Sequence, residues 1–391
     1  MKHCSSIFKV FYLATVFSTA TAVAQEEINI DKLGGIGNVK PIPVSLSGFS
    51  GEVNEVLRFD LYVMGFSFVG PDAAQYLVNG SNNGNVQGRL VDPHNQSTKF
   101  SKAYSGASAR RQAHAFADDI VYAITGKKGI AGTMIAFKND TGPTSEIFVS
   151  DFDGFGAQQV TRDNSIVAAP CWMPGKLALY YTSYKRGNPD IYSHDLGSRE
   201  RRAIAAYSGL NTSAAVSPDG RHVAMILSKS GSPDVYVCDA DGSNLRQLTK
   251  TKEDESSPCW SNDGQWVCFA AKIGERRALY KVSVSGGQPQ RIPTTGVSNP
   301  TEPDWSPDGK WIVFTAMMGG FEICVVPSTG GTATTLVSGE DPSWAPNSRT
   351  VVYARRQGGH RVLSILDVLT KQFKDVSRLS SGSNSQPGWA R

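Results

Sequence analysis

The chain has 391 residues, of which 40% are hydrophobic and 19% are charged, and its formal net charge is +4. This is the composition of a globular protein, and its 39 glycines and 20 prolines indicate many turns and short strands rather than long helices. The small net charge and the lack of any run of five basic residues argue against a nucleic-acid-binding protein.

Residues 1–24 have the features of a secretory signal peptide. Lys2 and Lys9 supply positive charge, an apolar stretch follows over 10–17, and the tripeptide Ala-Val-Ala ends the segment as a small-x-small cleavage site. The apolar stretch is too short to span a membrane, which makes a membrane anchor the weaker alternative. We therefore expect cleavage after Ala24 and an exported, soluble mature chain.

Residues 25–131 show no internal repeat and predict a small α/β domain that begins with a short extended segment. The stretch 41–46 (PIPVSL) is typical of a strand, and 51–65 places five apolar residues on one helical face. Further strands follow, with turns at SNNG and DPHN. Residues 107–128 predict a second amphipathic helix that ends at Gly126.

The reactive residue types show no catalytic or metal-binding spacing. His114 and Asp118 stand four residues apart on the predicted second helix, and we expect a structural hydrogen bond or ion pair between them rather than a catalytic dyad. After the signal peptide no Cys-x-x-Cys or His-x-x-x-His pattern occurs, so the sequence indicates no metal and no cofactor, and it leaves open a Ca²⁺ ion held by loop oxygens in the axial channel. The remaining cysteines are odd in number, and buried thiols in strands are favoured over a disulfide for Cys171, Cys238, Cys259, Cys268 and Cys324.

Residues 132–391 repeat a short motif. The segment PDWSPDG at 303–309 recurs as PCWMPG, AAVSPDG, PCWSNDG, PSWAPNS and PGWAR, and two further β-rich ladders run in step with it. Four short strands per unit of about 40–45 residues, repeated six times, predict a six-bladed β-propeller rather than a linear β-solenoid. The sequence leaves open how the ring closes. The motif's central position falls at Trp172, Val216, Trp260, Trp305, Trp344 and Trp389.

The motif itself is interpreted as architecture. A tryptophan that recurs at one phase of each unit is expected to pack between blades, because an indole buries a large apolar area. The Pro-Asp-Gly that follows is expected to form a tight turn. A turn role is therefore favoured over catalysis for the polar residue before the turn glycine or its equivalent, namely Asp219, Asp263, Asp308 and Asn347.

The order of segments resembles the TolB family, the periplasmic propeller proteins of the Tol–Pal cell-envelope system. The match is strongest over 110–137 (RRQAHAFADDIVYAITGKKGIAGTMIAF), and EINID at 27–31 is similar to the family's mature N-terminus. The resemblance implies a monomeric, non-enzymatic periplasmic scaffold that meets membranes only through its partners. It would link the inner-membrane Tol complex to the peptidoglycan-associated lipoprotein, Pal, and support outer-membrane integrity and constriction during cell division.

The same resemblance implies two partner sites. The extreme N-terminal segment would bind the C-terminal domain of TolA, a contact consistent with strand addition to a sheet edge. Its residues are Glu26, Glu27, Ile28, Asn29, Ile30 and Asp31. A Pal-like lipoprotein would bind loops of the propeller that lie just before the Pro-x-Trp motif. Carried over and extended to the later blades, these positions are Leu210, Asn211, Ser213, Ser256, Ser257, Thr301, Glu302, Glu340 and Asp341.

Two other classes of protein are compatible with a secreted propeller. One is an enzyme, either a glycosidase with acidic residues around the axis or the propeller of a serine peptidase, although the Gly-x-Ser-x-Gly motif of the latter is absent from the sequence. The other is a propeller that binds a different ligand. Two carboxylates about 5–10 Å apart in a deep axial pocket would favour a glycosidase, whereas a shallow, loop-rimmed face would favour protein binding.

Overall fold

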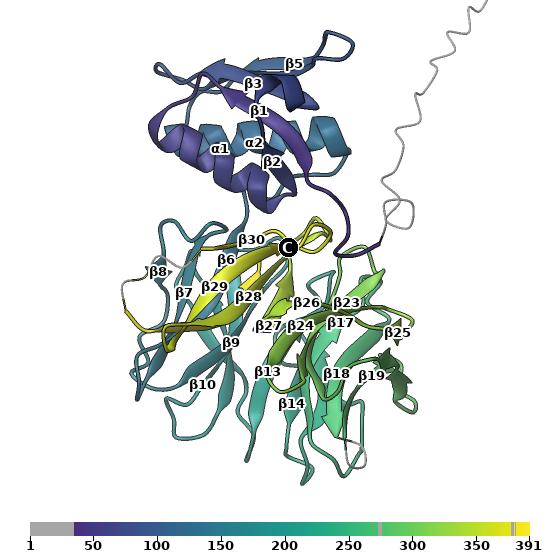
Figure 1. Ribbon diagram of the computed structural model, residues 1–391. Helices are drawn as coiled ribbons and strands as arrows, with labels where there is room; N and C mark the ends of the chain where they lie inside the picture. The colour runs from purple at the N-terminus through teal and green to yellow at the C-terminus, as the bar shows by residue number, and fades with distance from the viewer. Residues whose placement is uncertain (1–34, 273–275, 377–378, 380) are drawn as a thin grey trace, which may run out of the picture.

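The computed structural model describes residues 35–272, 276–376, 379 and 381–391. It shows a small α/β domain above a ring of six four-stranded sheets (Figure 1), which confirms the predicted fold class. The predicted signal peptide and the segment 26–31 lie outside the described residues. Among the residues that are described, no helix is long and apolar enough to cross a membrane.

The N-terminal sheet is mixed, with the strand order β2-β1-β3-β4-β5. The first strand pairs in parallel with its two neighbours, and the last three strands pair antiparallel. A short 3-10 turn (η2, Pro71–Ala73) precedes the third strand. The strands are β1 (Ile42–Ser47), β2 (Phe66–Phe68), β3 (Tyr76–Ser81), β4 (Gln87–Asp92) and β5 (Ser97–Ala103).

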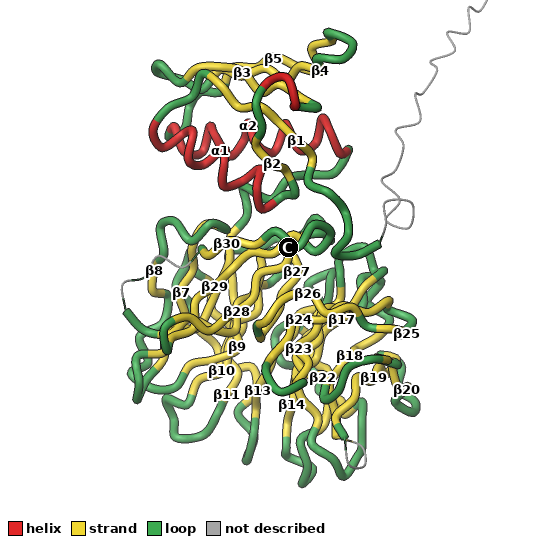
Figure 2. Tube along the Cα trace, in the orientation of Figure 1, coloured by secondary structure: helices red, strands yellow, loops and turns green. Residues whose placement is uncertain are grey.

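Two helices, α1 (Gly51–Val63) and α2 (Ala109–Thr125), lie between this sheet and the propeller (Figure 2). The Ser108 side chain caps the start of α2 by accepting a hydrogen bond from a backbone N–H. Gly126 ends it with a left-handed φ of 70°, which glycine adopts without steric cost. The predicted apolar stripes of both helices are buried, apart from the partly buried Ile124.

Each propeller blade is a four-stranded antiparallel meander whose first strand lies nearest the axis. A two-stranded parallel pair, β21 (Thr294–Thr295) and β25 (Gly331–Thr332), adds to the rim. Blade by blade, the strands are β31 (Ser383–Trp389), β6 (Met134–Asp140), β7 (Ser145–Asp151), β8 (Gln158–Gln159); β9 (Val167–Trp172), β10 (Ala178–Ser183), β11 (Asp190–Asp195), β12 (Arg201–Ala205); β13 (Asn211–Val216), β14 (His222–Leu227), β15 (Asp234–Asp239), β16 (Arg246–Gln247); β17 (Glu255–Trp260), β18 (Trp266–Lys272), β19 (Arg277–Ser283), β20 (Gln290–Ile292); β22 (Pro300–Trp305), β23 (Trp311–Met317), β24 (Phe321–Pro327), β26 (Thr334–Ser338); β27 (Glu340–Trp344), β28 (Thr350–Gln357), β29 (His360–Asp367), β30 (Phe373–Asp375).

The ring closes through strand β31. This strand pairs antiparallel with β6, so it forms the inner strand of blade 1, whose other three strands come from the beginning of the propeller sequence. The six inner strands contact one another in the order β31, β9, β13, β17, β22, β27 and back to β31. Every blade therefore has two blade neighbours, and no inner strand is left at an open edge of the ring.

The repeated tryptophans join neighbouring blades, as the sequence predicts. All five are at most 7% exposed. Three of their indole N–H groups also donate a hydrogen bond to a backbone carbonyl on the inner strand of the preceding blade. These pairs are Trp172–Gly388, Trp260–Ala215 and Trp344–Asp304, with N–O distances of 3.1, 2.9 and 3.1 Å. The indole thus supplies both apolar area and a directional bond between blades.

The turn after each tryptophan is also confirmed as architecture. In blade 5, Gly309 N–H donates to the Ser306 carbonyl at 2.9 Å and Gly309 has a φ of 76°. The Asp308 carboxylate accepts from the Ser306 hydroxyl at 2.6 Å and from a backbone N–H at 3.1 Å. In the equivalent turns the serine hydroxyl bond lowers the pKa of Asp219 and Asp263. These carboxylates hold the turns closed.

The two domains share one hydrophobic core at their junction. The Phe152 ring, at the end of β7, lies 5.8 Å from the Phe59 ring of α1 and 6.4 Å from the Trp389 ring of β31, measured between centroids. Next to it, the buried guanidinium of Arg110 on α2 forms an ion pair with the buried Asp153. Helices of one domain and blade 1 of the other are therefore packed as one unit.

The expected pairing of His114 with Asp118 is wrong. His114 Nδ1 instead lies 2.7 Å from Asp60 Oδ2 on α1, and both side chains are buried. Burial raises the pKa of Asp60 to about 6. Asp118 Oδ1 accepts from the Ala131 N–H at 2.9 Å, which holds the linker to the propeller against α2. The partner of His114 lies on the other helix, α1, so residue spacing within α2 could not predict it.

Trp344→Ala is expected to lower the free energy of unfolding by about 3–5 kcal/mol, because it empties a buried site between blades 5 and 6. Trp344→Phe keeps most of the ring volume and loses mainly the bond to the Asp304 carbonyl, so it should cost only about 1–2 kcal/mol. Urea unfolding followed by circular dichroism measures both variants. Equal stability of the alanine variant and the wild type would contradict an interblade role.

Candidate binding face of the propeller

A cavity of about 420 Å³ follows the propeller axis and is lined by all six inner strands. At one end it is bounded by the turns that face the N-terminal domain, and at the other by the second to fourth residues of the inner strands. The end away from the N-terminal domain is open, and the side chains that line it are held on rigid strands. We therefore take this end of the ring as the candidate binding face.

Each inner strand carries a β-bulge at the same level of the cavity, where the pairing register with its neighbour shifts. At this level one non-glycine residue per blade has a left-handed φ between 49° and 57°. Such residues are uncommon, so six of them in one ring are a built feature of the fold. They are Ala169, Ser213, Ser257, Glu302, Asp341 and Gln386, and all six line the cavity.

Four of the nine residues assigned to a Pal-like site are bulge residues, namely Ser213, Ser257, Glu302 and Asp341. Their expected placement in loops is wrong, because they lie within the inner strands. A bulge lets a strand continue past a residue with positive φ, so the strand begins earlier than the loop-like sequence indicates. The structure brings these four residues together around one opening.

The other five assigned residues lie close by. Ser256, Thr301 and Glu340 each precede a bulge residue directly, and Glu340 forms an ion pair with Arg361 at 2.5 Å. Leu210 stands one residue before β13 and is partly buried. Asn211 is fully buried, and its side-chain amide donates to the carbonyls of Tyr207 and Gly209 in its own loop at 2.8 and 3.2 Å and to the Pro189 carbonyl of blade 2 at 3.0 Å. Its side chain therefore fixes the conformation of the loop that precedes β13.

Sequence reasoning missed two members of the ring, Ala169 and Gln386. Both stand directly before the proline of a Pro-x-Trp or Pro-x-Trp-like motif, at the phase of the assigned residues. That phase was the signal that could have identified them. Gln386 also lies on β31, which places the ring-closing strand inside the candidate site.

Half of the ring is joined by hydrogen bonds from blade to blade. The Glu302 carboxylate accepts from the Asp341 N–H at 3.0 Å, and the Asp341 carboxylate accepts from the Gln386 N–H at 2.9 Å. The Gln386 side-chain carbonyl then accepts from the Ala169 N–H at 2.9 Å. The remaining bulge residues are alanine or serine, so the larger polar side chains gather on the half formed by blades 5, 6 and 1.

The two carboxylates of this half-ring influence each other. Burial, followed by the neighbouring Glu302 charge, raises the pKa of Asp341 to about 8. Asp341 is therefore largely protonated at neutral pH, which limits the negative charge held in the cavity. Within the described ranges, no group of three or more His, Cys, Asp or Glu side chains is placed to hold a metal ion.

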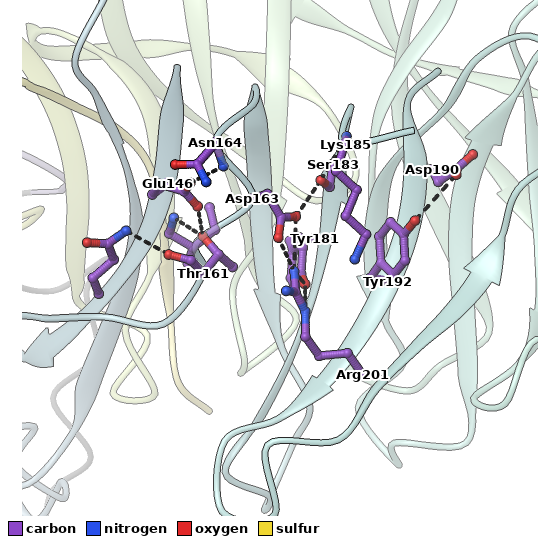
Figure 3. A network of polar contacts seen from close by, with 12 residues as sticks. Glu146, Thr161, Asp163, Asn164, Tyr181, Ser183, Lys185, Asp190, Tyr192 and Arg201 are labelled. Atoms are coloured by element: carbon purple, nitrogen blue, oxygen red, sulfur yellow. Dashed lines mark hydrogen bonds and ion pairs between the residues drawn. The ribbon is translucent and has the colours of Figure 1, made fainter. Parts of the chain in front are cut away.

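The loops around the opening are held by buried polar groups. Figure 3 shows the loop between blades 1 and 2, where the Asp163 carboxylate accepts from Arg201 at 2.8 Å and from the Ser183 hydroxyl at 2.5 Å. In the same network Glu146 accepts from the Asn164 N–H at 2.8 Å (Figure 3). These bonds cross from one blade to the next, so the rim loop has a defined position before any partner arrives.

A second rim loop is held in the same way before blade 4. The buried Glu255 carboxylate accepts from the Val235 N–H at 2.9 Å and from the hydroxyls of Thr249 and Thr251 at 2.5 and 2.9 Å. Burial raises the pKa of Glu255 to about 7. Together with Asn211 before blade 3, these contacts preorganise the rim on the blades that carry Ser213 and Ser257.

Comparison with known proteins places this architecture in a family. A family model described as the TolB beta propeller domain matches residues 121–391. The Tol–Pal system protein TolB of Bordetella pertussis is 32% identical over 205 residues, which cover 52% of this chain and 47% of that protein. The corresponding protein of Bordetella parapertussis is equally similar, with 46% of its length covered. The chain thus spans about half the length of the curated relatives it matches.

Solved structures show the same fold. The crystal structure of TolB from Acinetobacter baumannii superimposes with a TM-score of 0.81 at 22% identity, covering 91% of this chain and 98% of that one. A putative TolB from Agrobacterium tumefaciens gives a TM-score of 0.53 at 18% identity, covering 64% and 91%. Because the family model covers well over half of the sequence, including every blade, the chain belongs to the TolB β-propeller family.

Proposed function

We propose that this chain is a non-enzymatic scaffold of the Tol–Pal system, located in the periplasm, whose propeller binds a Pal-like peptidoglycan-associated lipoprotein. Family membership and the names of the curated relatives support this role. The observation that carries the proposal is the ring of six bulge residues around the axial opening, framed by rim loops with fixed positions. A rigid, concave surface of this kind binds a partner with little ordering cost.

Exposed apolar side chains support a protein partner at this face. Ile166, just before β9, is 46% exposed, and Met317, the last residue of β23, and Met318, in the turn that follows, are 46% and 39% exposed. The Met317 N–H is bonded to the Ser298 carbonyl at 3.2 Å, which places the hairpin beside the loop that leads to β22. Methionine is enriched at protein interfaces, and exposed apolar side chains beside the opening gain free energy when a protein partner buries them.

We propose a second contact, in which residues 26–31 of the N-terminal segment bind the C-terminal domain of TolA. Although these residues are outside the described part, the residues that follow are bonded to blade 6. The Gly37 and Val39 N–H groups each donate at 3.1 Å, to the carbonyls of Val368 and Leu369. A partner held by residues 26–31 would thus be joined to the propeller through the anchored residues 37–39. In this way the chain would link the inner-membrane Tol complex to Pal and support outer-membrane integrity and constriction during division.

One observation favours the glycosidase alternative, because Glu302 and Asp341 are two carboxylates in an axial cavity. Each of them, however, accepts a backbone N–H of the next blade, and Glu302 also accepts from the Thr315 hydroxyl at 2.7 Å. A general acid or nucleophile must have its oxygen atoms directed at a substrate. We therefore assign this pair to the joint between blades.

Asp341→Asn is expected to raise the free energy of unfolding at pH 8 by about 1–3 kcal/mol and to have little effect at pH 4. Because the pKa of Asp341 is raised from 3.8 to about 8 in the folded chain, its contribution to stability is complete below pH 4 and is lost as the pH rises to 8. Asparagine keeps an acceptor for the Gln386 N–H. Urea unfolding at both pH values, with the exposed Asp254→Asn as control, measures the effect. A variant less stable than wild type at pH 8 would contradict this account.

Ser256→Arg and Thr301→Arg are each expected to weaken binding of the soluble domain of a Pal-like lipoprotein at least tenfold. Both substitutions place a long charged side chain at the opening without altering a bulge residue. Ser285→Arg, an exposed position in the turn at the opposite end of blade 4, is the matched control. Isothermal titration calorimetry measures the dissociation constants. Wild-type affinity in both rim variants would exclude this face as the binding site.

Deletion of residues 26–31 is expected to abolish capture of the TolA C-terminal domain while leaving Pal binding and the melting temperature unchanged. The physical reason is that the segment precedes the residues anchored to blade 6, so its removal breaks no described contact. A pull-down with both partners separates the two sites. Normal capture of TolA by the shortened chain would show that the N-terminal assignment is incorrect.

A further inference from the structure

The cysteines of the described chain are free thiols. The expectation of buried thiols is confirmed for Cys238, Cys259, Cys268 and Cys324, whereas Cys171 is half-buried. The cysteines differ in which residue lies opposite each of them on the neighbouring strand. Only two of them, among the described residues, face each other across a pair of hydrogen-bonded strands.

Cys259 on β17 lies directly opposite Cys268 on the neighbouring antiparallel strand β18. Opposed residues in such a pair have Cα atoms about 4.5 or 5.5 Å apart, depending on the hydrogen-bonding position. Both spacings fall within the Cα separation of about 4.4–6.8 Å found in disulfides. The residues opposite the other cysteines are Tyr180 for Cys171, Val223 for Cys238 and Phe314 for Cys324.

The two thiols share one environment. Directly opposed residues project from the same face of a sheet, and both sulfurs belong to the core cluster between blades 4 and 5 that contains Trp305. Burial, together with a hydrogen bond to the Cys268 thiol, raises the pKa of Cys259. In the folded chain the Cys259 thiol is therefore a poor nucleophile, and oxidation is favoured while the strands are still accessible during folding.

The bulge beside Cys259 gives the backbone room to adjust. The register of β17 shifts between Ser256 and Cys259, where two residues oppose one. Opposed Cβ atoms are about 4.5–5.5 Å apart, and a disulfide needs about 3.5–4.5 Å, so closure requires a small approach of the strands. A bond formed under this constraint is reduced more readily than an unstrained structural disulfide.

We propose that Cys259 and Cys268 form a cross-strand disulfide when the chain folds in the presence of a disulfide-containing oxidant, and that this bond holds the Ser257 bulge at the axial opening. One cysteine thiolate attacks the oxidant disulfide and releases one thiol. The second cysteine displaces the remaining half, so two protein thiols are oxidised and one oxidant disulfide is reduced to two thiols. This inference rests on strand register and is independent of the proposed function.

The test uses the chain from residue 25 onward, which contains five cysteines. The chain is reduced, unfolded and refolded with a mixture of oxidised and reduced glutathione, and then treated with N-ethylmaleimide after denaturation. We expect three alkylated thiols and one intramolecular disulfide by intact mass, and non-reducing peptide mapping should join the peptides that carry Cys259 and Cys268. Refolding with dithiothreitol should give five alkylated thiols.

Cys259→Ser and Cys268→Ser should each abolish the linked peptide, whereas the matched controls Cys238→Ser and Cys324→Ser should retain it. Hydrogen exchange of β17 amides should be at least threefold slower in the oxidised wild type than in the reduced wild type, because the bond ties the strand beside the bulge. The mass and peptide measurements on the wild type do not depend on the folding of any variant. Five alkylated thiols after oxidising refolding, or a linkage between other cysteines, would overturn the proposal.

Discussion

The pairing of β31 with β6 is the interaction on which the rest of the structure depends, because it joins the two ends of the propeller sequence within one blade. The Asn139 amide reinforces it by donating to Asn384 at 2.8 Å. The same strand carries Trp389 into the junction with the N-terminal domain and Gln386 into the bulge ring. Loss of this one pairing would therefore open the ring, loosen the junction and disrupt the candidate face together.

The candidate face combines a rigid frame with an uneven chemical surface. Bulges at one level of all six inner strands set the frame, and side chains of three bulge residues, Glu302, Asp341 and Gln386, bond to the next bulge residue around the ring. Burial of the Asp341 carboxyl, and secondly the neighbouring Glu302 carboxylate, raises the pKa of Asp341. The opposite half presents the small residues Ser213 and Ser257, over which a partner can approach the strands closely.

The domain junction explains why the N-terminal domain sits in a defined position. Its helices share a core with blade 1 through Phe152, and the buried pairs Arg110–Asp153 and His114–Asp60 lie next to that contact. Asp118 holds the linker through the Ala131 N–H. Only Arg110–Asp153 of these two pairs crosses between the domains, so removing one of its partners by substitution would leave the other charge buried and unpaired at the junction.

The sequence alone determined the number of blades, the buried tryptophans, the turn role of Asp308 and both helices, because each depends on a local period or a local turn. The sequence also pointed to Ser257 and Glu302, two residues of the bulge ring, because each stands directly before the proline of the repeated motif. Only the tertiary structure decided the ring closure by β31, the partner of His114 and the opposition of Cys259 to Cys268. Those contacts join residues whose distance in space depends on strand register and helix packing. Neither can be predicted from the residue spacing within one segment.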